Sequence, residues 1–365
     1  MQVPGVRKDY IAIAGRTAVV LAAVAAALLP IPSTAIERFY SQGPYAFAQP
    51  WITRASNLTA VAWIDLLVVF GAGAWIALGA RDVVRRRSWP RAIARIGVRS
   101  AVWAAACYLA FLAAWGFNYR RVPLVQKLAF DAARVSPDAA RDLGMAAVKE
   151  VNALYDAAHA ILAARAGPAQ AVDPTLAAAF ARAQIDLGAT RLAVPGRPKQ
   201  TAFDLYFQRA GVSGMTDPFF LETLVAGDLL PIERPFVIAH EWSHLAGIND
   251  EGEANFAGWL TCLHGSAAEQ YSGWLFLVNE LARAVRDADR DAMTTALGPG
   301  PREDLRAIAR RIQQHVSPRV SAAGWRAYNQ YLKANRVERG VASYAEVVKL
   351  VLGVSFDPDW VPKKR

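Results

Sequence analysis

Residues 233–260 have the sequence ERPFVIAHEWSHLAGINDEGEANFAGWL, which contains an HExxH motif. Side chains four positions apart share one face of an α-helix, so His240 and His244 can bind the same metal ion. Glu241 lies about 100° further around the helix, where its carboxylate can reach a water molecule on the metal rather than the metal itself. The motif therefore predicts a zinc site on a helix, with Glu241 as the general base of a hydrolase.

The flanking residues predict where this helix begins and ends. Pro235 suits the first turn, because its ring fixes φ and its missing N–H is not needed there. Gly247 suits the C-terminal end, because glycine readily adopts the left-handed conformation that ends many helices. The apolar run at residues 236–239 can bury the face that does not bind metal. We therefore expect a short, buried helix that carries both histidines.

Three acidic residues follow His244 closely, and each is a candidate third ligand. Asp250 and Glu253 have the D-x-x-E spacing of a capping box, which gives both a structural task and leaves Glu251 in the first turn of a second helix. Asn255 lies four residues after Glu251 on the same face, so one of them can bind the metal while the other holds a ligand histidine. We expect Glu251 to be the ligand. Asp250, which has the H-x-x-G-x-x-D spacing of metzincins, and Glu253 stay open as alternatives.

The N-terminal third of the chain is typical of a membrane anchor. Its three apolar stretches lie at about residues 11–32, 58–80 and 101–117. The second is long enough for a full crossing and has one ionisable side chain, Asp65, to which we assign no role. The first contains Arg16 and has features of a cleavable signal peptide, but we expect it to be retained. Residues 1–119 are therefore predicted to form three transmembrane helices.

Charge predicts the orientation of these helices. The formal net charge is +10, and residues 1–119 contain 12 Lys and Arg against 4 Asp and Glu. Most of this surplus lies between the second and third stretches, at Arg81, Arg85, Arg86, Arg87, Arg91, Arg95 and Arg99. The positive-inside rule places that segment in the cytoplasm and residues 120–365 outside it. Basicity confined to a membrane anchor also argues against nucleic-acid binding.

The remainder of the chain is predicted to be mainly helical. Ser136-Pro137 and Asp173-Pro174 each combine a good N-cap with proline at the first helical position, which predicts helices near 137–165 and 174–187. Phe219–Val225 is expected to be a short edge strand on which an extended substrate backbone can pair. The two cysteines of the chain cannot form a disulfide framework.

Other residues are weaker candidates for the chemistry. A zinc hydrolase commonly has a side chain that hydrogen-bonds the developing oxyanion, and the candidates here are Tyr328, Tyr331, Tyr344 and His315. None of these is assigned as catalytic, because aromatic side chains more often pack in a core. His159, His264 and His315 are expected to be surface or hydrogen-bonded core histidines.

Two resemblances to known families rest on these motifs. Glu251–Asn255, with the sequence EGEAN, resembles an element of gluzincin metallopeptidases, among them the HtpX-type membrane proteases. In those families the first glutamate binds zinc and the asparagine or aspartate supports a histidine. This resemblance implies that Glu251 is the third zinc ligand.

The chain also resembles an uncharacterised bacterial family of membrane proteins, a domain of unknown function. The shared elements are W-G-x-N-Y-R-R, HExxHxxG, ExEANF, Y-x-x-Y-L-K and G-x-x-S-Y, found here at residues 115–121, 240–247, 251–256, 328–333 and 340–344. This resemblance spans most of the chain. It implies a zinc peptidase but names no substrate.

Together, these inferences predict a multi-pass protein of the bacterial inner membrane. Its extracytoplasmic domain is expected to be zincin-like, of gluzincin type, with a small β element. The expected activity is hydrolysis of a peptide bond in a peptide or protein substrate, with Zn²⁺ held by His240, His244 and Glu251, and with Glu241 accepting the proton of the attacking water. The alternatives are a non-catalytic, metal-stabilised membrane receptor or assembly factor, and a zinc hydrolase of cell-envelope amides. The sequence identifies neither the substrate nor an oligomeric state.

Overall fold

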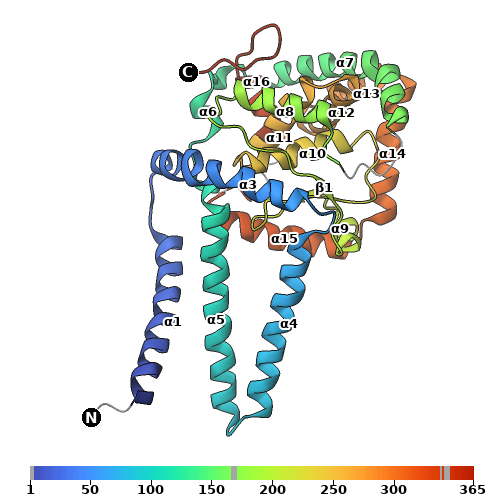
Figure 1. The fold of residues 1–365 in the computed structure, drawn as a ribbon. Helices are drawn as coiled ribbons and strands as arrows, with labels where there is room; N and C mark the ends of the chain where they lie inside the picture. The colour runs from blue at the N-terminus through green and yellow to red at the C-terminus, as the bar shows by residue number, and fades with distance from the viewer. Residues whose placement is uncertain (1–3, 166–170, 338, 341–345) are drawn as a thin grey trace.

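The computed structural model describes residues 4–165, 171–337, 339–340 and 346–365. It is mainly helical, as expected, and three long helices extend from one side of a helical domain (Figure 1). These are α1 (Pro4–Leu28), α4 (Trp63–Val84) and α5 (Trp89–Ala114). The start of α1 and the turn between α4 and α5 lie at the end of the three helices that is far from the domain (Figure 1).

Two of these helices, α4 and α5, are each long and apolar enough to cross a membrane. In α1, Ile13–Leu28 meets the same criterion only together with Ser33–Asn57, from which it is separated by a bend of 118°. The described residues therefore contain two candidate spans, or three if the bent pair counts as one, where the sequence predicts three.

The two candidate helices do not begin and end where the apolar stretches at about residues 58–80 and 101–117 do. Helix α4 begins at Trp63 and reaches Val84, and α5 begins twelve residues before residue 101, so that Arg91, Arg95 and Arg99 lie inside it. Arginine is a good helix former, and its long side chain can carry its charge away from an apolar surface. A cluster of charges therefore does not end the helix, and only residues 85–88 form the turn.

The segment after the bend lies against the helical domain (Figure 1). It consists of α2 (Ser33–Ile36), the π-helix η1 (Glu37–Tyr45) and α3 (Ala46–Asn57). The Gln49 amide donates to the Val194 carbonyl at 2.8 Å, and the Thr53 hydroxyl donates to the Leu221 carbonyl at 3.1 Å. Part of the predicted membrane anchor thus contacts the domain directly.

The other helices build the domain. Its first half contains η2 (Gly116–Arg120), α6 (Leu124–Lys127), η3 (Ala132–Arg134), α7 (Pro137–Ala164), α8 (Pro174–Asp186) and α9 (Asp204–Ala210). Its second half contains α10 (Arg234–Leu245), α11 (Glu251–Leu263), α12 (Ala267–Ala284), α13 (Asp287–Ala296), α14 (Pro299–His315), α15 (Pro318–Ala334) and α16 (Glu346–Gly353).

The predicted helices near 137–165 and 174–187 are confirmed as α7 and α8. The Ser136 hydroxyl accepts a hydrogen bond from the backbone N–H of Ala139, and the Asp173 carboxylate accepts two from the first turn of α8. Each cap satisfies N–H groups that have no partner within the helix. The starts of both helices are therefore determined locally.

A small three-stranded sheet lies beside α10. Its strands are β1 (Pro198–Lys199), β2 (Gly214–Thr216) and β3 (Thr223–Val225), in the order β1-β3-β2, with β3 parallel to β1 and antiparallel to β2. The predicted edge strand at Phe219–Val225 is therefore wrong in length and in position, because β3 is short and central. The Asp217 carboxylate accepts the backbone N–H groups of Phe219 and Phe220, which holds these residues in a turn.

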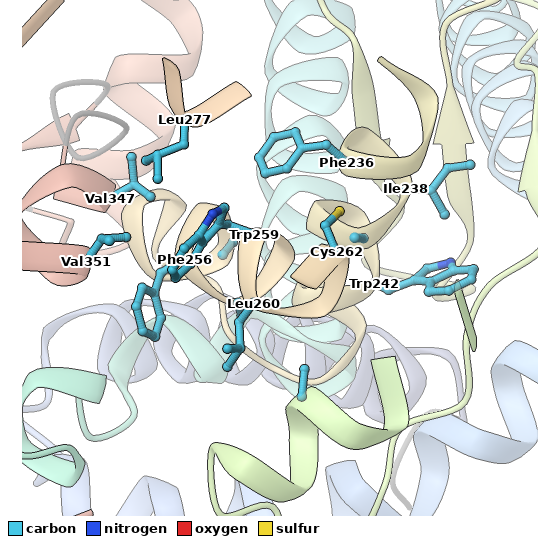
Figure 2. Packing of buried hydrophobic residues seen from close by; sticks show 14 of the residues in the cluster. Phe236, Ile238, Trp242, Phe256, Trp259, Leu260, Cys262, Leu277, Val347 and Val351 are labelled. Atoms are coloured by element: carbon cyan, nitrogen blue, oxygen red, sulfur yellow. The ribbon is translucent and has the colours of Figure 1, made fainter. Parts of the chain in front are cut away.

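The core of the domain is built around α10 and α11. Figure 2 shows Trp242 of α10 together with Phe256, Trp259 and Leu260 of α11, and all four are fully buried. The two helices approach closely at Gly258, where a Cβ atom would lie only 3.0 Å from backbone atoms of His240. Because Gly258 has no side chain, α11 can pack directly against the turn of α10 that contains His240.

Candidate metal centre

The HExxH motif and the first turn of α11 meet in the domain interior. Nε2 of His240 and Nε2 of His244 lie 3.3 and 3.5 Å from the same atom, Oε2 of Glu251. One ligand atom from each of the three side chains lies within 4.8 Å of the other two, and all three residues are buried. The side chains expected to bind metal are thus brought together, with their ligand atoms facing a common point.

The electrostatics of these three residues suit a cation. Burial opposes ionisation of Glu251, but the neighbouring charges of His244 and His240 hold the pKa of its carboxyl well below the usual range. Burial likewise opposes protonation of His244, but the Glu251 carboxylate raises the pKa of that imidazole to about 9. Oε2 of Glu251 is buried and has no hydrogen-bond partner among the described residues. A buried carboxylate oxygen that lies at ion-pair distance from two imidazoles, without a hydrogen bond of good geometry, is an arrangement that a bound Zn²⁺ would complete.

Backbone contacts orient one of the histidines. Nδ1 of His244 lies 2.8 Å from the carbonyl oxygen of Ile248, which selects the tautomer that turns Nε2 toward Glu251. Within the part of the chain that the structure describes, Nδ1 of His240 has no such partner. The sequence predicts that Asn255 hydrogen-bonds a ligand histidine. It cannot predict the contact with the Ile248 carbonyl, because every residue type has a backbone carbonyl.

The two alternative third ligands are engaged elsewhere. The Asp250 carboxylate caps α11 by accepting the backbone N–H of Glu253 at 3.1 Å. The Glu253 carboxylate accepts the backbone N–H of Leu124 at 2.6 Å. Among the described residues, the group of side chains placed to hold a metal contains Glu251 and neither of these two.

The carboxylate of Glu241 is held by strand β2. The Thr216 hydroxyl lies 2.9 Å from Oε2 of Glu241 and 2.8 Å from its backbone carbonyl. A Cβ atom on Gly214 would lie 2.6 Å from Oε1, so the glycine makes room for the carboxylate against the strand. Burial raises the pKa of Glu241. Thr216 and Gly214 are part of the site, but the sequence does not reveal them because they precede the motif by about 25 residues.

Tyr328 of α15 contacts the carboxylate of Glu251. Its hydroxyl donates to Oε1 of Glu251, the carboxylate oxygen that does not face the histidines. Tyr331, one turn later, stacks on Tyr328 and contacts the ring of Tyr119. Of the oxyanion candidates, Tyr328 thus contacts the metal centre, while Tyr344 lies outside the described residues.

The element at residues 115–121 holds the C-terminal end of α10. The Trp115 indole donates to the His244 carbonyl at 3.0 Å, and its ring lies edge-on to the His244 imidazole. Arg121 donates to the Gly247 carbonyl at 2.9 Å and makes a two-pronged ion pair with Glu37 at 2.7 and 2.8 Å. These bonds satisfy carbonyls that a helix end leaves free. The W-G-x-N-Y-R-R element, which directly follows the candidate span α5, therefore contacts the helix that carries His240 and His244.

Residues 40–352 match the family described as "Protein of unknown function (DUF3810)". This region is well over half of the chain. The chain belongs to the DUF3810 family. No curated protein and no solved structure matches it.

In this DUF3810 protein, the matched region runs from η1 to α16. It therefore includes both helices of the metal centre, strand β2 and the element at residues 115–121. The resemblance to an uncharacterised family, expected from the motifs, is confirmed. The family description assigns no activity, so the chemistry has to be argued from the side chains themselves.

The remaining histidines each lie beside a carboxylate outside the metal centre. His159, His264 and His315 are 2.8 Å from oxygens of Asp304, Asp186 and Asp228, respectively.

Asp65, the acid in the second apolar stretch, also has structural partners. It accepts hydrogen bonds from the Thr201 hydroxyl and the Ala202 N–H, each at 2.6 Å, and so links the start of α4 to the domain.

Replacing Arg121 with Gln should loosen the end of α10. The change removes the ion pair with Glu37 and the bonds to the loop after His244, so we expect a loss of about 2 kcal/mol in stability. The measurement is the thermal unfolding midpoint of the purified protein in detergent. Arg141→Gln is the control, because the ion-pair partners of Arg141 among the described residues are exposed carboxylates, so this change should alter the midpoint little. Equal midpoints for the two variants would contradict this role.

Proposed function

We propose that this protein is a membrane-anchored zinc metallopeptidase. The observation that carries the proposal is the convergence of His240, His244 and Glu251 on one buried point, beside a buried glutamate that is not needed as a ligand. A purely structural metal site has no use for that fourth group, whereas a hydrolase needs a base there. The likeness of Glu251–Asn255 to the gluzincin element supports the same ligand set.

Zinc, when bound, would polarise the scissile carbonyl and lower the pKa of a coordinated water to about 7. Glu241 then accepts the proton of the attacking water and delivers it to the leaving amine. Burial raises the pKa of the Glu241 carboxyl, which favours uptake of a proton by this group. The Thr216 hydroxyl fixes the carboxylate so that little reorganisation is needed.

The position of β2 supports a peptide as the substrate. β2 is an outer strand of the sheet and runs beside α10, with Thr216 in contact with Glu241. An extended peptide that pairs with the outer edge of β2 would place its backbone next to the metal centre. In this proposal β2 takes the substrate-pairing role expected from the sequence for Phe219–Val225.

The proposed function is tested by metal analysis of the purified protein and by its activity on a broad peptide library. We expect about one zinc per chain and cleavage that a chelator abolishes and added zinc restores. Protein that contains no transition metal after expression in zinc-supplemented medium would contradict the proposal.

We also propose that the domain lies outside the cytoplasm of a bacterial cell. The proposal rests on the arginine-rich turn, which lies at the far end of α4 and α5 from the domain (Figure 1). A cysteine introduced at residue 86 should resist a membrane-impermeant thiol reagent in intact cells, and one at an exposed domain position such as Asp138 should react. The reverse pattern would place the domain inside.

A further inference from the structure

A pocket of about 490 Å³ lies between α1, α4 and α5, away from the metal centre. Four arginines line it, and they come from all three helices: Arg16, Arg81, Arg95 and Arg99. A single carboxylate, Asp82, faces them. These five charged side chains give the pocket a net charge of +3, which attracts an anion.

The internal ion pair compensates only one of the four arginines. Arg99 lies 2.7 Å from Asp82, and Asp82 is largely buried. Nε and Nη2 of Arg99 are also buried, yet neither has a hydrogen-bond partner among the described residues. Arg16, Arg81 and Arg95 make no ion pair within the part of the chain that the structure describes. Guanidinium donors therefore remain available inside the pocket.

The remaining walls of the pocket are apolar. They include Leu78 of α4 and Val98, Val102 and Trp103 of α5. Guanidinium groups bind phosphate oxygens in pairs, and basic pockets between membrane helices are suited to phosphate headgroups. A mixed lining of arginines and apolar side chains fits a phosphate attached to an apolar group better than it fits a metal cation or a neutral sugar.

We propose that this pocket binds an anionic phosphate group. The phosphate can belong to a phospholipid headgroup or to a soluble phosphate compound, and the arginines supply the same recognition chemistry in both cases. The arginines then have a role beyond setting membrane orientation. The site is independent of the metal centre, so the proposal stands whether or not the protein is a peptidase.

The test uses the full-length protein in a non-ionic detergent at low salt. It is titrated in a calorimeter with dihexanoyl phosphatidylglycerol, with inorganic phosphate, and with dihexanoyl phosphatidylcholine, whose headgroup has no net charge. We expect saturable binding of about one phosphatidylglycerol per chain and much weaker binding of phosphatidylcholine. Tighter binding of phosphatidylglycerol than of phosphate identifies a lipid as the source, and equal binding of the two identifies a soluble phosphate compound.

Two double variants separate the pocket from general basicity. Arg81→Gln with Arg95→Gln should weaken phosphatidylglycerol binding by about tenfold or more, because two guanidinium groups of the pocket are lost. Arg85→Gln with Arg87→Gln removes the same charge from the neighbouring turn and should change binding by less than about threefold. Arg99 is left intact, since its replacement would leave the buried carboxylate of Asp82 without its ion-pair partner.

The thermal unfolding midpoint of both double variants should match that of the wild type. A loss of phosphatidylglycerol binding can then be attributed to the missing arginines and not to unfolding. Absence of saturable binding of both phosphatidylglycerol and phosphate to the wild type would overturn the proposal. An equal loss of binding in the two double variants would also overturn it, because the attraction would then be a property of the whole basic segment.

Discussion

Glu241→Gln should lower the rate of peptide hydrolysis by at least about 10²-fold, the usual contribution of a positioned general base. Glutamine has the size of glutamate and can still accept the hydrogen bond from Thr216, but it cannot take up the proton of the attacking water. Glu241 is adjacent to a proposed ligand and is not itself one. Zinc content and the thermal unfolding midpoint should therefore stay close to those of the wild type, and both are measured alongside the cleavage rate.

Glu280→Gln is the matched control, since it makes the same chemical change at a partly buried glutamate of α12, which pairs with Arg283. It should leave the cleavage rate unchanged. If Glu241→Gln instead supports full growth or fitness in a deletion strain, the catalytic proposal fails. That result would favour the receptor or assembly role, in which the metal only stabilises the domain. Cleavage of cell-envelope amides, but not of peptides, would identify the third class of function.

Replacing either histidine of the motif should remove almost all of the bound zinc. Zinc sites in proteins use three or four protein ligands, so the loss of His240 or His244 to alanine leaves too few. Glu251→Ala should also reduce the zinc content strongly. The measurement is the number of zinc ions per chain after dialysis against metal-free buffer. His315→Ala is the control, because His315 pairs with Asp228 and is not one of the described residues placed to hold a metal, so the zinc content should stay unchanged.

The same experiment decides among the three acidic residues. Asp250→Ala should keep the zinc and cost about 1 kcal/mol of stability, because it removes the N-cap of α11. Glu253→Gln should also keep the zinc, since its carboxylate contacts the backbone of Leu124. If Asp250→Ala strips the metal while Glu251→Ala does not, the metzincin-like spacing is the correct one and Glu251 is not the third ligand.

Features that depend on neighbours in the sequence could be predicted well. The caps Ser136 and Asp173 act on N–H groups within three residues, so the starts of α7 and α8 follow from the local sequence. Gly247 ends the metal-motif helix with φ of +75°, as its residue type indicates. Apolar length likewise identifies α4 and α5 as candidate spans, but hydropathy places their ends poorly because helical arginines interrupt the apolar run without ending the helix.

Features that depend on distant segments could not be predicted in this way. The β-forming residues around Phe219 predict a strand, but Asp217 turns the chain there and β1 and β2 decide which strand is central. Trp115 and Arg121 reach the end of α10 across more than 120 residues. Such contacts leave no periodicity in the sequence, and their residue types are compatible with many other environments.

The metal centre combines both kinds of information. The sequence by itself determined that His240 and His244 share a helix face, because a separation of four residues fixes that geometry wherever the helix lies. Only the tertiary structure decided which carboxylate faces them. Gly258 lets α11 approach the backbone of His240, which brings Glu251 to the two imidazoles while Asp250 and Glu253 turn to backbone N–H groups. The physical reason is that helix periodicity is set by local bonds, whereas the approach of two helices is set by the packing of side chains far apart in the chain.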